Sequence, residues 1–188
     1  MPQLSDLRVA VLATDGFEEP ELTEPVKALK ESGAHVTIVS PTPGDIQGVR
    51  HDLDKTVKVK VDRAVKEAQT DEFDAVLLPG GAINADRMRA VPEVQAFLQG
   101  MQGAGKPIAA ICHAPWELVS AGLVRGRTLT SYHTLQDDIR NAGGKWVDQE
   151  VVEDDNWVTS RKPADIPAFN KKMIELFSRR HQQMRQPA

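Results

Sequence analysis

The Cys112–His113 pair places a nucleophile next to a proton carrier, and Cys112 is the only cysteine in the 188-residue chain. The pair follows a short apolar run, residues 107–111, and precedes a helical pattern over residues 114–122. A thiol at such a strand-to-helix turn faces backbone N–H groups and the positive end of the helix dipole, and both favour the thiolate. The thiolate is the nucleophilic form, so we expect Cys112 to attack an electrophilic carbon. The alternative role for a single cysteine is that of a small buried hydrophobe.

A reactive cysteine needs a group that shares or moves its proton, and the chain offers several. Adjacent residues on a regular helix or strand do not face each other, so only a sharp turn could bring the His113 ring near the sulfur. Asp86 could orient that ring as the third member of a triad, or it could simply lie at a helix N-terminus. Glu18 and Glu21 offer a second arrangement, because a buried carboxyl group keeps its proton and can donate a hydrogen bond to a thiolate. They could equally form a solvated acidic loop.

The Gly80–Gly81 pair follows another apolar run, residues 74–78. Together with the N–H of His113, its backbone N–H groups could form an oxyanion hole for acyl transfer, although most such glycine pairs are merely turns. The five histidines show no spacing typical of metal ligands, and no phosphate-binding glycine motif is present. We therefore expect neither a metal nor a cofactor.

Short apolar runs alternate with amphipathic helical patterns along the chain. Strands are predicted at residues 8–13, 35–39, 74–78 and 107–111, and helices at residues 22–32, 92–103, 114–122 and 165–180. The alternating segment VKVKV at 57–61 predicts an edge strand or a hairpin, and a further hairpin is predicted from residues 146–152 and 157–160. This alternation predicts an α/β fold with a parallel sheet covered on both faces.

Ligands of such sheets bind at the carboxyl ends of the strands. Glu18 and Glu21 come after the first apolar run, Gly80–Gly81 and Asp86 after the third, and Cys112–His113 after the fourth. We therefore expect these three segments to crowd one edge of the sheet.

The composition limits the classes of protein to consider. A chain of 188 residues suits one domain, which we expect to span residues 1–188. The formal net charge of −4 argues against a nucleic-acid partner, and the N-terminal apolar run is too short for a membrane span. One cysteine cannot form an internal disulfide, so nothing indicates an oxidising compartment, and we expect a cytoplasmic protein.

Several longer segments together resemble a known family. They are GFEEPEL at 16–22, LLPGG at 77–81, AAICHAPWELVSAGLVRGR at 109–127, TSYHTLQDDIRNAGGKWVDQEVV at 130–152 and NWVTSRKPADI at 156–166. With these motifs the chain resembles the PfpI-type intracellular proteases of the class I glutamine amidotransferase-like superfamily. The parkinsonism-associated DJ proteins form another branch of the same superfamily.

The resemblance implies a flavodoxin-like three-layer sandwich, with Cys112 as the nucleophile on a strained elbow and His113 as its companion. Glu21 stands where the family has a glutamate that contacts the cysteine, and Glu18 stands at a nearby acidic position. The N–H groups of Gly81 and His113 would form the oxyanion hole.

Asp86 occupies the place of an acid that completes the triad across a subunit interface, which implies a homo-oligomer. The family often has glutamate there, and aspartate is one methylene shorter. Ala114 is a second departure, because many relatives have glycine at this position.

The resemblance leaves three functions open. The first, which we expect, is a cysteine hydrolase of peptide or amide bonds that acts in stress protection. The second is a cofactor-independent glyoxalase or protein deglycase that acts on methylglyoxal adducts. The third is a non-enzymatic redox sensor, because an exposed thiolate is readily oxidised.

Overall fold

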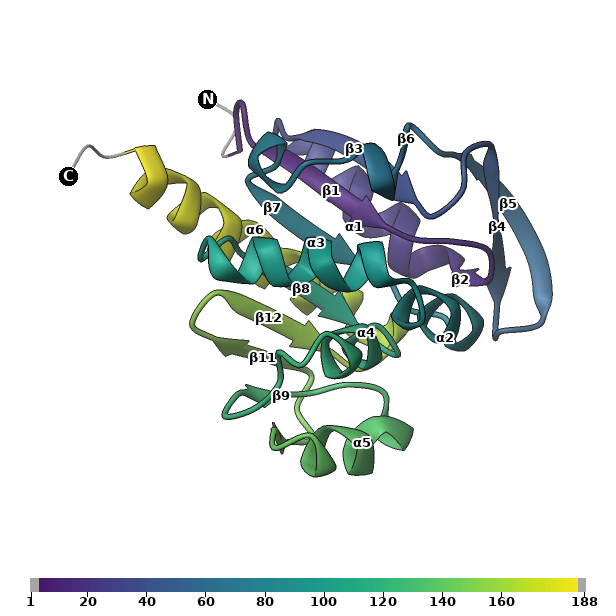
Figure 1. Cartoon of the computed structure of the whole chain (residues 1–188), viewed down its shortest axis with the longest axis vertical. Coiled ribbons are helices and arrows are strands. Elements are labelled where there is room, and N and C mark those ends of the chain that lie inside the picture. Colours follow the sequence, from purple (N-terminus) through teal and green to yellow (C-terminus); the bar gives the residue numbers. More distant parts are fainter. Residues whose placement is uncertain (1–3, 186–188) are drawn as a thin grey trace.

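A seven-stranded sheet runs through the middle of the structure, a computed structural model that describes residues 4–185 (Figure 1). The strand order is β11-β12-β8-β7-β1-β3-β6. The strands are β1 (Arg8–Leu12), β3 (His35–Ser40), β6 (Arg63–Ala64), β7 (Ala75–Leu78), β8 (Ile108–Ile111), β11 (Val151–Asp154) and β12 (Trp157–Ser160). Neighbouring strands are parallel except in the β11–β12 hairpin, so the predicted mostly parallel sheet is confirmed.

Alternate residues of the central strands supply two separate cores, as the strand period of two requires. In β1, Val9 and Val11 belong to one hydrophobic cluster, whereas Ala10 and Leu12 belong to the other. Both faces of the sheet are therefore buried, which explains why these strands read as continuous apolar runs.

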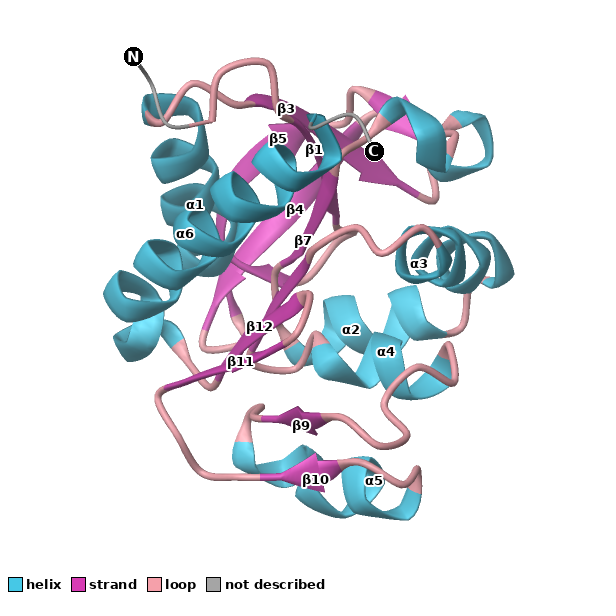
Figure 2. Ribbon diagram, turned by 90° about the vertical axis from the view of Figure 1, so that its left-hand side faces the viewer, coloured by secondary structure: helices cyan, strands magenta, loops and turns pink. Residues whose placement is uncertain are grey.

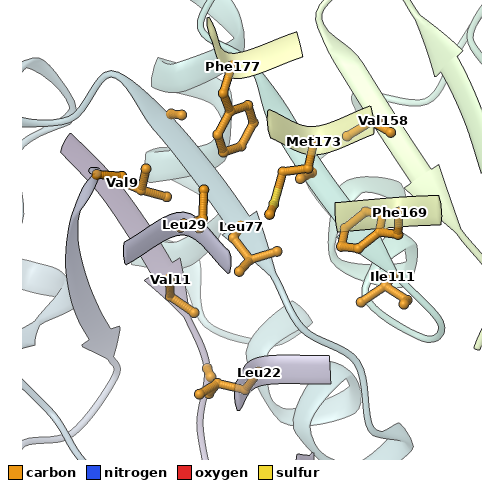
Figure 3. Close-up of a cluster of buried hydrophobic side chains, with 14 of the residues drawn as sticks. Val9, Val11, Leu22, Leu29, Leu77, Ile111, Val158, Phe169, Met173 and Phe177 are labelled. Carbon is orange, nitrogen blue, oxygen red and sulfur yellow. The ribbon is translucent and has the colours of Figure 1, made fainter. Parts of the chain in front are cut away.

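Helices on both faces complete the three layers (Figure 2). On one side lie α1 (Glu19–Glu31) and α6 (Ile166–Arg185). On the other side lie α2 (Ala82–Arg89), α3 (Pro92–Gly103) and α4 (Pro115–Ser120). A further short helix, α5 (Gln136–Asn141), follows α4 in the sequence. Figure 3 shows the first core, where Leu29 of α1 and Met173 of α6 lie in one cluster with Leu77 of β7. The predicted flavodoxin-like sandwich is thus confirmed.

Within residues 4–185, two smaller sheets and four 3-10 turns are separate from the central sheet. They are a sheet of β2 (Phe17–Glu18), β4 (Asp45–Arg50) and β5 (Asp54–Lys60), a pair of β9 (Thr128–Leu129) and β10 (Lys145–Trp146), and the 3-10 turns η1 (Val65–Glu67), η2 (Thr70–Glu72), η3 (His133–Leu135) and η4 (Pro163–Asp165). The β4–β5 pair is the predicted VKVKV hairpin, and it joins β2 rather than the central sheet. The turn of this hairpin reaches the carboxyl ends of the central strands.

Several helices and strands differ from those predicted from the sequence. Helix α1 begins at Glu19, because Pro20 opens its first turn, and it continues through Pro25. No bounds are predicted for helix α2, and the alternative that Asp86 lies at a helix N-terminus is wrong, because Asp86 lies in the middle of α2. Residues 145–146 pair with β9, so the β11–β12 hairpin begins only at Val151. Helix α6 continues to Arg185, so residues 182–185 are helical although the sequence predicts a frayed end over residues 182–188. Residues 186–188 lie outside the described residues.

Candidate active site

Cys112 occupies a sharp turn between β8 and α4, and its φ of 64° lies in the left-handed region. The surrounding backbone fixes this conformation: the Cys112 N–H donates to the Ser160 carbonyl at 3.0 Å, and the Cys112 carbonyl accepts from the Tyr132 N–H at 2.8 Å. A non-glycine residue persists there only where such contacts over-determine it. The turn brings Sγ to 3.3 Å from Nδ1 of His113, so the predicted pairing of these adjacent side chains is present.

Glu21 approaches the same sulfur from α1. Its side chain is completely buried, and its Oε2 accepts the Gly80 N–H at 2.9 Å. Burial raises the Glu21 pKa to about 8, although a side-chain hydrogen bond with Cys112 opposes the shift. The carboxyl group is therefore largely protonated at neutral pH, as expected for a group that donates a hydrogen bond to a thiolate.

The sequence predicts a lowered thiol pKa, and here the structure differs. Burial raises the Cys112 pKa, the Glu21 carboxylate raises it further, and only the N–H groups of His113 and Gly81 lower it. Burial dominates because Cys112 is only 6% exposed. When Glu21 keeps its proton, the repulsion disappears and the proton can stabilise the thiolate. Cys112 and Glu21 thus titrate as one pair.

A cavity of about 260 Å³ opens over the sulfur. Its lining combines residues from six separate segments, namely Glu18, Glu21, His51, Asp52, Gly81, Cys112, His113, Tyr132 and Pro163. Most of the predicted site residues therefore meet at one edge of the sheet, as the strand order required. Gly80 has a different part from the one predicted: its N–H is already bonded to Glu21, so it cannot serve as an oxyanion donor. The N–H groups of Gly81 and His113 remain for that role.

Asp86 does not join this group. It lies on the exposed side of α2 and is absent from the residues that line the cavity. Its predicted partner is the His113 of a second copy of the chain, so the intersubunit arrangement stays a prediction.

Sequence reasoning missed several residues that shape the site. The Tyr132 ring stacks on the His113 ring, with centroids 4.6 Å apart and 27° between the planes. Asn84, fully buried, donates through Nδ2 to the carbonyls of Pro79 and Gly80 and thereby fixes the glycine turn. Tyr132 lies within the TSYH segment, so its place beside the site was available as a signal. The position of Asn84 becomes visible only once α2 is known.

The charge on His113 depends on its surroundings. Burial lowers its pKa, the Asp52 carboxylate raises it, and His133 lowers it. A lowered pKa keeps the imidazole neutral and able to accept a proton at neutral pH. Within residues 4–185, no three His, Cys, Asp or Glu side chains are grouped so that they could hold a metal ion. Over the same residues, no helix is both long and apolar enough to cross a membrane.

An α/β sandwich that presents its only cysteine on a strained elbow, between a buried glutamate and a stacked histidine, defines a class of proteins with a cysteine nucleophile. The chain belongs to the DJ-1/PfpI family, whose profile matches residues 7–176. It is 42% identical over 170 residues to a deglycase of Thermococcus kodakarensis, covering 90% of this chain and 99% of the relative. It is 38% identical over 169 residues to YraA of Bacillus subtilis, described as a proposed cysteine protease, covering 90% and 97%. The crystal structure of DJ-1beta from Drosophila melanogaster superimposes with a TM-score of 0.82 at 27% identity, covering 97% of this chain and all of that one.

Proposed function

We propose that the protein is a cysteine-dependent hydrolase that removes carbonyl adducts from amines, with Cys112 as its nucleophile. The observation that carries the proposal is the 3.3 Å approach of His113 Nδ1 to Sγ on a left-handed elbow, which supplies a proton carrier at the nucleophile. The protonated Glu21 beside the sulfur suits a thiolate that adds to an aldehyde carbon. The deglycase activity named for the Thermococcus relative supports the same assignment.

For a methylglyoxal adduct the reaction balances without an oxidant. Sγ forms a bond to the former aldehyde carbon, and the amine leaves with a proton that His113 delivers. In the resulting hemithioacetal, the aldehyde carbon is oxidised to a thioester while the neighbouring ketone is reduced to an alcohol. Water then cleaves the thioester and restores the thiol. The net change is adduct plus water to amine plus lactate, and His113 moves the protons.

Hydrolysis of peptide bonds is the second candidate, and it needs an acid that orients His113. In this second candidate function, Asp86 of a second copy of the chain supplies the acid. Ile83 is 42% exposed one helical turn before Asp86, and Leu53 is 84% exposed at the same groove beside α2. Large apolar side chains at that exposure are typical of a surface that another chain covers. The cysteine protease described for Bacillus subtilis supports this candidate.

The deciding experiment compares wild-type protein with Cys112→Ala on methylglyoxal-modified N-acetylarginine, free methylglyoxal and an unmodified peptide. We expect wild-type protein to release N-acetylarginine and lactate in equal amounts and the variant to release neither. Circular dichroism checks that the variant is folded. Turnover that survives in folded Cys112→Ala would exclude the cysteine mechanism, and cleavage of the peptide alone would favour the second candidate. We also place the protein in the cytoplasm, because the chemistry needs a reduced thiol. The role that we propose for it is stress protection.

A further inference from the structure

We propose that Asp52, at the turn of the β4–β5 hairpin, is the in-chain carboxylate that stabilises a proton on His113, and hence a positioning residue of the active site. The family resemblance implies this part for Asp86 of a second chain. The inference rests on the proposed role of Cys112 as nucleophile. It adds a member to the site from the same chain.

The hairpin turn that carries Asp52 is strained. His51 has a φ of 53° and Asp52 a φ of 61°, so two successive non-glycine residues adopt the left-handed conformation. Such strain is retained where the surroundings over-determine it, and it is concentrated at functional sites.

Hydrogen bonds from the neighbouring elements hold this turn against the cavity. The Glu18 carboxylate accepts the N–H of His51 at 3.2 Å and the N–H of Asp52 at 3.4 Å. Oδ1 of Asp52 accepts the N–H of Ala82, the first residue of α2, at 2.8 Å. The Asp52 side chain is therefore fixed at one oxygen, and it lines the cavity that also contains His113.

Several titratable groups face His113 across this cavity. They are Cys112 from its own turn, Glu18 and Glu21 from β2 and α1, His51 and Asp52 from the hairpin, and His133 beyond the stacked Tyr132 ring. Burial lowers the His113 pKa, and the Asp52 carboxylate is the largest influence that raises it. Asp52 also raises the Glu21 pKa. Its charge therefore favours protons on both His113 and Glu21.

Asp52→Asn tests this assignment, because an asparagine Oδ1 can still accept the Ala82 N–H while the charge is lost. Asp52→Gly is the second variant, since glycine adopts a positive φ without strain and keeps the turn if asparagine does not. The control is Asp54→Asn, which removes the same charge from an exposed position on the same hairpin. The readouts are the His113 pKa from NMR titration of the ring, and the pH dependence of Cys112 alkylation by iodoacetamide.

We expect both Asp52 variants to lower the His113 pKa by about half a unit or more and to shift the alkylation profile, whereas Asp54→Asn changes neither. With modified N-acetylarginine as substrate, kcat should fall about tenfold with little change in KM, because proton transfer is impaired rather than binding. An unchanged His113 pKa in Asp52→Asn would overturn the inference, as would a larger shift in Asp86→Asn. Wild-type protein without turnover would overturn the proposed function, but a shifted His113 pKa would still support Asp52 as the group that holds the charge.

Discussion

Gly80 and Glu21 lie in such close contact that the Gly80 N–H donates to Glu21 Oε2 at 2.9 Å, and a Cβ on Gly80 would collide with that oxygen. The same Cβ would lie 2.7 Å from Cys112 Cβ and 2.8 Å from the Ile111 carbonyl oxygen. Gly80 does not have a positive φ, so lack of space and not backbone conformation requires glycine there. This glycine is what lets the carboxyl group of α1 reach the elbow.

Gly80→Ala should therefore damage both the fold and the site. We expect the free energy of unfolding to fall by about 1–3 kcal/mol, as for other overpacked positions, and Cys112 alkylation to change because Glu21 is displaced. Urea unfolding and alkylation rates measure the two effects. Gly103→Ala is the matched control, since a Cβ there meets nothing within 4 Å. Equal stability of the two variants would contradict the crowding argument.

The strain at Cys112 predicts an inverted order of stability. Glycine is normally less stable than alanine in a folded chain, but at a φ of 64° it avoids the clash of the β-carbon. Cys112→Gly should therefore be more stable than Cys112→Ala by about 1 kcal/mol, although both lack the sulfur. At Ala114, with a φ of −56°, substitution by glycine should cost about 0.5–1 kcal/mol. Thermal unfolding of the three variants gives the comparison, and the ordinary order at position 112 would show that the elbow is relaxed.

The sequence predicted the part of the site that follows directly from the parallel arrangement of the strands. Residues that come after buried strands must gather at the carboxyl edge of the sheet, and Glu18, Glu21, Gly81, Cys112 and His113 do so. The continuous apolar runs revealed these strands because both faces of the sheet are buried.

The rest depended on tertiary detail that periodicity does not carry. Asp52 reaches the site because His51 and Asp52 both adopt the left-handed conformation in the hairpin turn. The sequence did not reveal this turn, because neither residue type is required to adopt that conformation. The raised pKa of Cys112 depends on how deeply the elbow is buried, whereas the turn alone suggested the opposite shift.

Glu21 makes stability depend on pH in a definite direction. Its pKa is about 8 in the folded protein against 4.5 for an ordinary glutamate, so the folded state binds more protons between these values. The Glu21 contribution is therefore full below about pH 4.5 and is lost as the pH rises toward 8, at up to about 1.4 kcal/mol per pH unit. Glu21→Gln lacks this titration, so its stability relative to wild type should increase with pH. Urea unfolding at several pH values checks this, and parallel curves for the two proteins would contradict it.

Glu117 is a second glutamate whose pKa is raised by burial, but it lies outside the lining of the proposed active site. It is completely buried in α4, and neither carboxyl oxygen has a hydrogen-bond partner among residues 4–185. Burial raises its pKa well above 4.5, so the unfolded chain releases a proton that the folded chain retains. Glu117 does not line the cavity over Cys112, and nothing in the proposed reaction needs it.

Glu117→Met should therefore stabilise the protein by about 1–3 kcal/mol, the usual cost of an unpaired buried polar group, and leave turnover unchanged. The gain should grow between pH 5 and pH 7, because only wild-type protein must keep that carboxyl group neutral. The control is Glu93→Met on the exposed first turn of α3, where we expect a change within about 0.5 kcal/mol. A loss of stability in Glu117→Met would mean that the carboxyl group is hydrogen-bonded after all, for instance to a buried water molecule.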